Sequence, residues 1–141
     1  KIKAEIDRLE LNNHVHFLGM VPNEHVKAIY SLCSFVVMPS LFEAASGPIY
    51  EAWQEKKAVA SSNVTSLPEQ VDNTGLLFDP FSVESISDAI KNLTMNEVLR
   101  NDFAVKGFEK SKKFTWNITA QKYRALYRLV GKLKTTSENI L

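Results

Sequence analysis

The chain contains little that points to a disulfide scaffold or a membrane span. Cys33 is the only cysteine among 141 residues, so no disulfide can form within one chain, and its apolar neighbours favour a small buried hydrophobe. No apolar run approaches the roughly 18 residues of a membrane-spanning helix, and no signal-peptide pattern is present. With a hydrophobic fraction of 45% and a net charge of +1, we expect one soluble, cytoplasmic domain.

Metal-binding patterns are equally scarce. His14 and His16 alternate with Val15 and Phe17, so a strand there would place both imidazoles on one face. Two ligands do not make a metal site, and no Asp-x-Asp triplet occurs. We therefore expect no metal and no other cofactor.

What the chain does contain is an alternation of helix and strand patterns. We predict strands over 14–18, 35–38, 58–61 and 75–78, and helices over 1–11, 23–33, 48–56, 67–71, 83–93, 96–112 and 116–133. This order predicts an α/β fold, a Rossmann-like parallel sheet with right-handed crossovers and helices on both faces. The first helix carries an apolar stripe of Ile2, Ile6 and Leu9, which we expect to lie on a sheet. Because no strand precedes it, we expect the front part of the domain to be missing.

The segment 35–63 has the layout of a ligand site. A buried strand ends at Pro39, and a polar loop from Ser40 to Gly47 follows. In open parallel sheets the ligand crevice lies outside the carboxyl ends of the strands, so this loop is the segment that we expect to contact a ligand. Glu43 lies in the middle of it.

A helix that opens on Pro48 adds an anion-binding end to this loop. Proline suits the first helical position, with Gly47 as the cap, so the N–H groups of Gly47, Ile49 and Tyr50 should point to the crevice. Such an end attracts phosphate. Glu51 lies one turn further along, where its carboxylate can accept hydrogen bonds from two vicinal hydroxyls, and we assign it to a ribose.

With seven residues between Glu43 and Glu51, the chain resembles the retaining group 1 glycosyltransferases. Their GT-B fold consists of two Rossmann-like halves, and the carboxyl-terminal half carries a Glu-x7-Glu motif. The resemblance continues through VHFLGMV, AVASSN, SLPEQV, GLLFDP, SVESISDAI and FTWNITAQKYRALY, nearly the whole chain. It implies that residues 1–141 are a partial carboxyl-terminal nucleotide-sugar-binding domain, whose terminal helix, 115–134, would cross to the amino-terminal half.

The resemblance assigns roles to residues by position. Glu43 would lie at the reacting face of the donor sugar as the catalytic residue, and Glu51 would hold the ribose. The other implied donor-binding groups are main-chain groups. Those after Glu43 would bind the sugar and the diphosphate, and those after the strand 14–18 would bind the nucleobase. They belong to Ala44, Ala45, Ser46, Gly47 and Ile49, and to Gly19, Met20 and Val21.

The loop after Glu43 departs from the usual Glu-Gly-Phe-Gly-Leu-Pro motif of that family. Ala44, Ala45, Ser46 and Gly47 precede Pro48 here. Backbone amides can still serve, but a positive φ at residue 44 or 46 would cost roughly 1 kcal/mol or more in alanine or serine. Many members also have glycine where this chain has Lys56, which raises the same question there.

The implied activity is transfer of a hexose from a nucleoside-diphosphate sugar to an acceptor hydroxyl, with retention of the anomeric configuration. The expected partners are the nucleotide-sugar donor and an unknown acceptor, either a glycan or a lipid-linked molecule. Family members neutralise the diphosphate with an Arg–Lys pair that nothing in residues 1–14 matches, so we expect the isolated fragment to be inactive. The alternatives are a non-catalytic sugar-nucleotide-binding or regulatory module, and an epimerase or phosphorylase on the same fold.

Several acidic residues have purely structural alternatives. Glu51 could complement the dipole of its own helix. Ser66 and Glu69 form a Ser-x-x-Glu pattern, which we interpret as a capping box. Asp79 ends a strand before Pro80, and we predict that it caps or turns the chain there.

The stretch 106–134 contains nine Lys or Arg residues and one acid, Glu109. We interpret it as a solvated helix face, with peripheral contact to an anionic inner membrane surface as the alternative. Its aromatic residues fall on an apolar stripe at helical spacing, which favours packing over nucleic-acid binding. The stripe consists of Trp116, Ala120, Tyr123, Tyr127 and Val130.

Overall fold

A computed structural model describes residues 1–138, with side chains for residues 1–131. Its centre is a parallel sheet of three strands in the order β1 (Phe35–Met38), β2 (Ala58–Ser62) and β3 (Gly75–Phe78). Phe35 is paired with Ala58, and Val59 with Gly75. All of β2 is buried, as expected for a central parallel strand.

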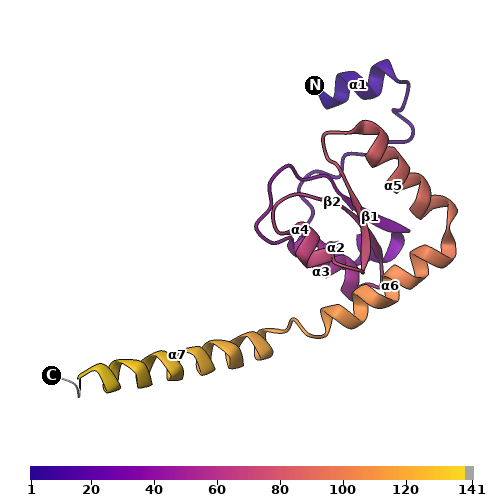
Figure 1. Ribbon diagram of the computed structural model, residues 1–141. Coiled ribbons are helices and arrows are strands. Elements are labelled where there is room, and N and C mark those ends of the chain that lie inside the picture. Colours follow the sequence, from indigo (N-terminus) through magenta and orange to yellow (C-terminus); the bar gives the residue numbers. More distant parts are fainter. Residues whose placement is uncertain (139–141) are drawn as a thin grey trace.

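Seven helices are formed in the described part of the chain (Figure 1). The predicted helices were placed correctly, with shifts of a few residues at their ends. Their bounds are α1 Ile2–Arg8, α2 Asn23–Leu32, α3 Gly47–Gln54, α4 Leu67–Val71, α5 Val83–Met95, α6 Glu97–Ser111 and α7 Trp116–Glu138.

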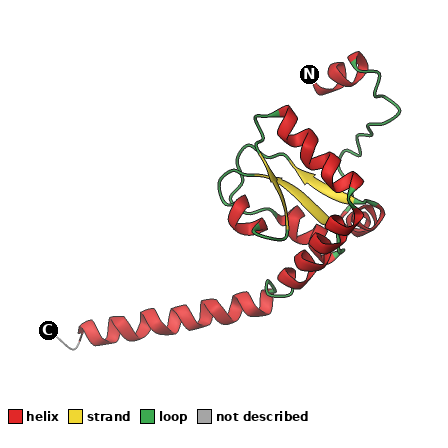
Figure 2. Ribbon diagram, turned by 45° about the vertical axis from the view of Figure 1, so that its right-hand side comes forward, coloured by secondary structure: helices red, strands yellow, loops and turns green. Residues whose placement is uncertain are grey.

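Two hydrophobic cores lie on opposite faces of the sheet because side chains of β2 alternate between them. Val59 packs with α3 and α4 in one core. Ala58 and Ala60 pack with Phe78 and with α5 in the other. Figure 2 shows the strands between these helices. The prediction of an α/β sheet with helices on both faces is therefore confirmed.

Helix α6 fastens the carboxyl-terminal part of the domain to α3. Gly107 of α6 lies so close to Trp53 that an added Cβ would overlap the indole ring. Trp53 is completely buried. Lys56 follows α3, and its Nζ lies 4.9 Å from the ring centroid of Phe108 in α6. The close approach of α6 and α3 thus depends on residue 107 being glycine, which has no side chain.

The predicted strand 14–18 is wrong. Residues 14–18 form no strand, and none of the described strands pairs with them. A strand is stable only when a neighbour takes up its hydrogen bonds. Without that neighbour Phe17 and Leu18 remain 58% and 62% exposed.

The apolar stripe of α1 predicted that this helix lies on the sheet, and this prediction is wrong. It lies apart from the strands in Figure 1, and the loop that follows folds back beside it, with Lys3 Nζ 5.6 Å from the ring centroid of Phe17. Ile6 is buried, but Ile2 is 70% exposed and Leu9 48%. The stripe therefore has no sheet to cover in the described chain.

Helix α7 extends away from the rest of the domain (Figure 1). Its apolar stripe is solvent-exposed, with Trp116 at 90% and Tyr127 at 71%. None of the described helices is long and apolar enough to cross a membrane.

The packing of α6 gives a stability prediction. Gly107→Ala should lower the free energy of unfolding by about 1–3 kcal/mol, because overpacking at Trp53 outweighs the better helix propensity of alanine. Gly131→Ala in α7 is the matched control, since its added Cβ meets nothing within 4 Å. Urea denaturation measures both. Equal midpoints for the two variants would contradict the close packing of α6 on Trp53.

Candidate functional site

Glu43 lies in the loop that follows β1 at the carboxyl edge of the sheet. The strand ends at Met38 and Pro39 follows, which cannot donate a ladder hydrogen bond. Ser40 Oγ donates to the Glu43 carboxylate at 3.3 Å. The side chain of Glu43 is half-buried, so its carboxylate is held from one side and open to solvent on the other.

The loop after β2 binds the backbone of Glu43. Thr65 Oγ1 accepts a hydrogen bond from the Glu43 N–H at 3.3 Å and donates to the Glu43 carbonyl oxygen at 2.5 Å. Ser66 Oγ donates to the same carbonyl at 3.1 Å and also contacts the carbonyl oxygen of Ala44. Both main-chain groups of Glu43 thus have partners from a segment 22 or 23 residues away.

The capping box predicted for Ser66 and Glu69 is wrong. Ser66 does precede α4, but its side chain makes no capping hydrogen bond. Its hydroxyl proton is directed to Glu43 and Ala44 instead. A hydroxyl has one proton to donate, and here a tertiary partner takes it in place of a local one.

Gln70 forms two hydrogen bonds with the main chain of Ser46, the residue just before α3. Its Oε1 accepts from the Ser46 N–H at 2.9 Å, and its Nε2 donates to the Ser46 carbonyl at 2.8 Å. Both residues are buried. Ser46, not Gly47, is the N-cap, so the predicted cap was one residue late.

This arrangement decides which of the predicted amides are available. The Ser46 amide is occupied by Gln70. In the described part of the chain, the amides of Ala44, Ala45 and Gly47 donate to no protein group. The amide of Ile49 lies in the first turn of α3, where amides have no partner within the helix.

The alanine and serine residues of the loop create no backbone strain. Residues 44–46 have no positive φ, so the conformation that only glycine adopts easily is not needed there. Positive φ occurs instead at Lys56, with 53°, and at Thr65, with 51°. Lys56 thus adopts the conformation that favours glycine, as the sequence comparison with the family had suggested. Residues 44 and 46 do not adopt it.

Glu51 lies beside an open groove between α2 and α3. The groove has a volume of about 450 Å³, and an ion pair between Lys27 and Glu55, at 3.6 Å, lies along it. Glu51 is the fifth residue of α3 and therefore lies beyond the first turn of this helix. The helix dipole has little effect on a carboxylate at that position. The lining residues are Asn23, Val26, Lys27, Tyr30, Glu51, Gln54 and Glu55.

Tyr30 is a residue of this groove that the sequence did not single out. The pKa of its phenol is raised to about 12, mainly by burial and in addition by the hydrogen bond to the adjacent Glu51 carboxylate and the charge of that carboxylate. The two residues lie 21 positions apart on different helices, so no local pattern indicates the contact.

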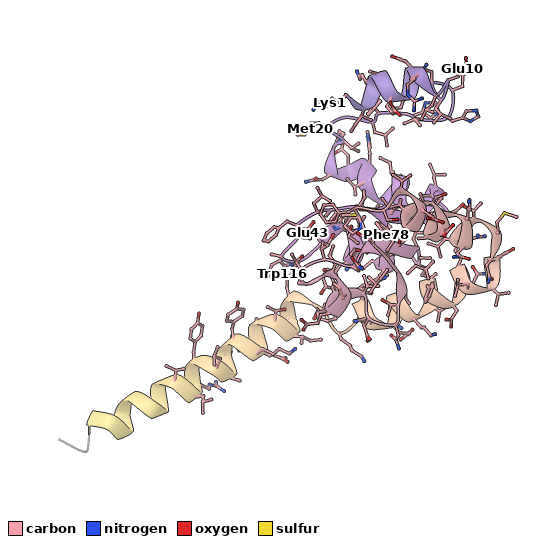
Figure 3. All side chains as sticks on the ribbon, turned by 45° about the horizontal axis from the view of Figure 1, so that its top comes forward. Lys1, Glu10, Met20, Glu43, Phe78 and Trp116 are labelled. Carbon is pink, nitrogen blue, oxygen red and sulfur yellow. The ribbon has the colours of Figure 1, made fainter. Side chains whose placement is uncertain are left out.

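The segment expected to read the nucleobase follows the loop after α1. Met20 is fully exposed, and Figure 3 shows it on the side of the molecule that carries α1, well apart from Glu43. Gly19 has a φ of 64°, and a Cβ added there would meet nothing within 4 Å. Val21 is half-buried. The described residues do not bring Gly19 or Met20 into the groove beside Glu51.

Two structural expectations have clear outcomes. Asp79 Oδ1 accepts from the Phe81 N–H at 2.9 Å, which confirms the predicted turn at Pro80. Cys33 is half-buried, and its thiol donates to the Tyr30 carbonyl at 3.1 Å. Burial raises the pKa of the thiol.

No group of three potential metal ligands occurs among the described residues.

Comparisons with known proteins point to one family. The family described as "Glycosyl transferases group 1" matches residues 1–110. The chain is 35% identical to O-antigen chain mannosyltransferase B of Escherichia coli over 126 residues, 89% of this chain and 33% of that protein. The matched part of the chain thus spans about a third of the length of this relative.

Solved structures show the same fold. Sucrose-phosphate synthase of Thermosynechococcus elongatus is similar with a TM-score of 0.84 and 25% identity, over 94% of this chain and 34% of that one. The carboxyl-terminal domain of a glycosyl transferase group 1 family protein of Francisella tularensis is similar with a TM-score of 0.68 and 25% identity, over 77% and 57% of the two chains.

The contact between Tyr30 and Glu51 predicts a pH dependence. Unfolded tyrosine ionises near pH 10, while folded Tyr30 keeps its proton to about pH 12. The unfolded state therefore loses protons first, and the free energy of unfolding should fall as pH rises from about 10 to 12. Tyrosinate absorbance during titration measures the ionisation. Glu51→Gln should lower the pKa of Tyr30, but not to 10, because the burial remains.

Glu55→Gln is the control for that titration, because Glu55 lines the same groove but contributes nothing to the shift at Tyr30. An unchanged Tyr30 titration in Glu51→Gln would show that the two side chains do not interact in solution.

Proposed function

Because the chain belongs to the group 1 glycosyl transferase family and has the fold of a GT-B carboxyl-terminal domain, we propose that the protein transfers a hexose from a nucleoside-diphosphate sugar to an acceptor hydroxyl, with the anomeric configuration retained. The observation that carries the proposal is the meeting of Glu43, the open amides after it and the start of α3 at one sheet edge. The groove beside Glu51 lies one turn along the same helix.

The reaction requires stabilisation of the charge that grows on the leaving diphosphate. Amides aimed at such charge are effective because they are fixed before the reaction begins. The amides of Ala44, Ala45, Gly47 and Ile49 take this role, while Ser46 contributes none because Gln70 occupies its N–H. Backbone amides at a helix start supply positive potential without a metal ion.

Glu43 acts at the donor sugar. Its carboxylate is oriented by Ser40 and favours the positive charge that develops at the anomeric carbon as the diphosphate leaves. The backbone of Glu43 is held on both sides by Thr65, so the carboxylate keeps its place during this step.

Glu51 holds the ribose of the donor. A ribose presents two adjacent hydroxyls, and a carboxylate can accept a hydrogen bond from each. The neighbouring phenol of Tyr30 then limits the orientations open to Glu51. The groove of about 450 Å³ beside it is of a size suited to small ligands, and it accommodates the nucleoside.

The substrates of the whole protein are part of this proposal, because the chain covers only a third of its mannosyltransferase relative. That relative's name makes mannose the first donor sugar to test. The proposed acceptor is a glycan or a lipid-linked molecule. Peripheral contact of the exposed basic residues of α7, Lys122, Arg124 and Arg128, with an anionic membrane would fit a lipid-linked acceptor.

A non-catalytic module that binds a sugar nucleotide is the second candidate. Its support is the replacement of the two usual glycines of the loop by Ala44 and Ser46. The absence of positive φ at these residues weakens that support, because the loop keeps its amides without glycine.

Removal of the Glu43 carboxylate tests the catalytic role. In the intact protein, Glu43→Ala should lower kcat by about 100-fold or more with little change in donor affinity, since the loss falls on the transition state. Glu84→Ala, an exposed glutamate of α5, is the matched control. Unchanged turnover in Glu43→Ala would disprove the role. Donor binding without turnover in the wild-type protein would favour the non-catalytic module.

Donor binding by Glu51 has a separate test. Saturation-transfer NMR with GDP-mannose, UDP-glucose and the free nucleotides should reveal one preferred base, and Glu51→Ala should weaken binding of the free nucleotide about tenfold. The Glu84→Ala control should bind normally. Equal affinity of wild type and Glu51→Ala for the nucleotide would exclude Glu51 from the ribose site.

A further inference from the structure

Four side chains of one segment, 62–70, hold the backbone of another, 38–46. Ser62 Oγ donates to the Met38 carbonyl at 3.0 Å, where β1 ends. Further along, Thr65 and Ser66 bond to Glu43 and Ala44, and Gln70 bonds to Ser46. Each contact joins residues 22 to 24 positions apart. Met38 and Ser62 are the last residues of two neighbouring strands, and the residues that follow them, as far as Gln70 in α4, supply the other contacts at the carboxyl edge of the sheet.

Thr65 is held in a strained conformation by these contacts. Its φ of 51° is rare for a β-branched residue and is usually found at a functional position. Its side chain is exposed, so packing does not impose this conformation. What holds Thr65 is a pair of hydrogen bonds at its hydroxyl, which accepts from the N–H of Glu43 and donates to the Glu43 carbonyl oxygen.

Gln70 determines the course of the chain at the other end of the loop. Its amide group satisfies both main-chain groups of Ser46 in a buried position, and Ser46 is the N-cap of α3. The direction of α3, and with it the place of Glu51, therefore depends on Gln70. The same contact withdraws the Ser46 amide from any ligand.

We infer that Thr65, Ser66 and Gln70 are positioning residues that set the geometry of the donor loop 43–46, fixing Glu43 at one end and the start of α3 at the other. This inference rests on the proposed function for its consequence in catalysis. The hydroxyls and the amide group do not touch the donor. They decide where the carboxylate of Glu43 lies and which amides remain open.

The first test compares substitutions at Thr65 in the intact protein. Thr65→Val keeps the β-branched shape and removes the hydroxyl, and it should lower kcat/KM for the donor by about tenfold, as expected for two lost hydrogen bonds. Thr65→Ser keeps the hydroxyl and should stay within about twofold of wild type. Thr94→Val is the matched control, because Thr94 Oγ1 donates to a carbonyl within α5 at 2.8 Å.

The pattern across these variants separates positioning from general stability. Rescue by serine, together with normal activity in Thr94→Val at a similar melting temperature, would support positioning. Equal losses in Thr65→Val and Thr65→Ser, or no loss in Thr65→Val, would overturn it.

The second test is independent of activity. Amide exchange followed by NMR should show the Ser46 amide protected and the Ala44 amide unprotected in the wild-type protein, because only the first has a partner. Gln70→Met, which is similar in length and has no amide, should release the Ser46 amide. If the wild-type protein binds no nucleotide sugar, the proposed function fails, and exchange still decides the inference. Protection lost in Gln70→Met would support it, and a Ser46 amide that exchanges freely in the wild type would overturn it.

Discussion

The hydrogen bonds between the loops after β1 and β2 are the interactions on which the site depends. Polar side chains of one loop satisfy main-chain groups of the other, and the sheet alone would not fix either loop. The left-handed backbone of Thr65 costs on the order of 1–2 kcal/mol, and each of its two hydrogen bonds contributes about 0.5–1.5 kcal/mol. The strain and the contacts are therefore of similar size, which is why the conformation persists at an exposed residue.

The two cores provide a rigid base for these loops. Val59 on one face and Ala58 and Ala60 on the other anchor β2 between helix layers, and Gly107 allows α6 to pack on Trp53 of α3. Helix α3 thus has a fixed carboxyl-terminal end at Trp53 and a fixed beginning at Ser46. Glu51 lies between these two points and faces Tyr30 of α2.

The ends of the described chain contrast with this base. Both α1 and α7 lie away from the sheet (Figure 1), and Trp116 and Tyr127 on α7 are largely exposed. The same chain covers about a third of the mannosyltransferase and of sucrose-phosphate synthase.

The sequence by itself determined the elements that depend on local signals. Continuous apolar runs identified three strands, Pro48 located the start of α3 to within one residue, and the spacing of Glu43 and Glu51 indicated the family. The strand over 14–18 failed because alternation alone cannot supply a pairing partner. The tertiary structure decided the rest: that Ser66 bonds to Glu43 and not to its own helix, that Ser46 is the N-cap of α3 and is held by Gln70, and that Tyr30 meets Glu51. These contacts join residues about 20 positions apart, where a hydroxyl or amide group chooses among partners that only the folded chain brings within reach.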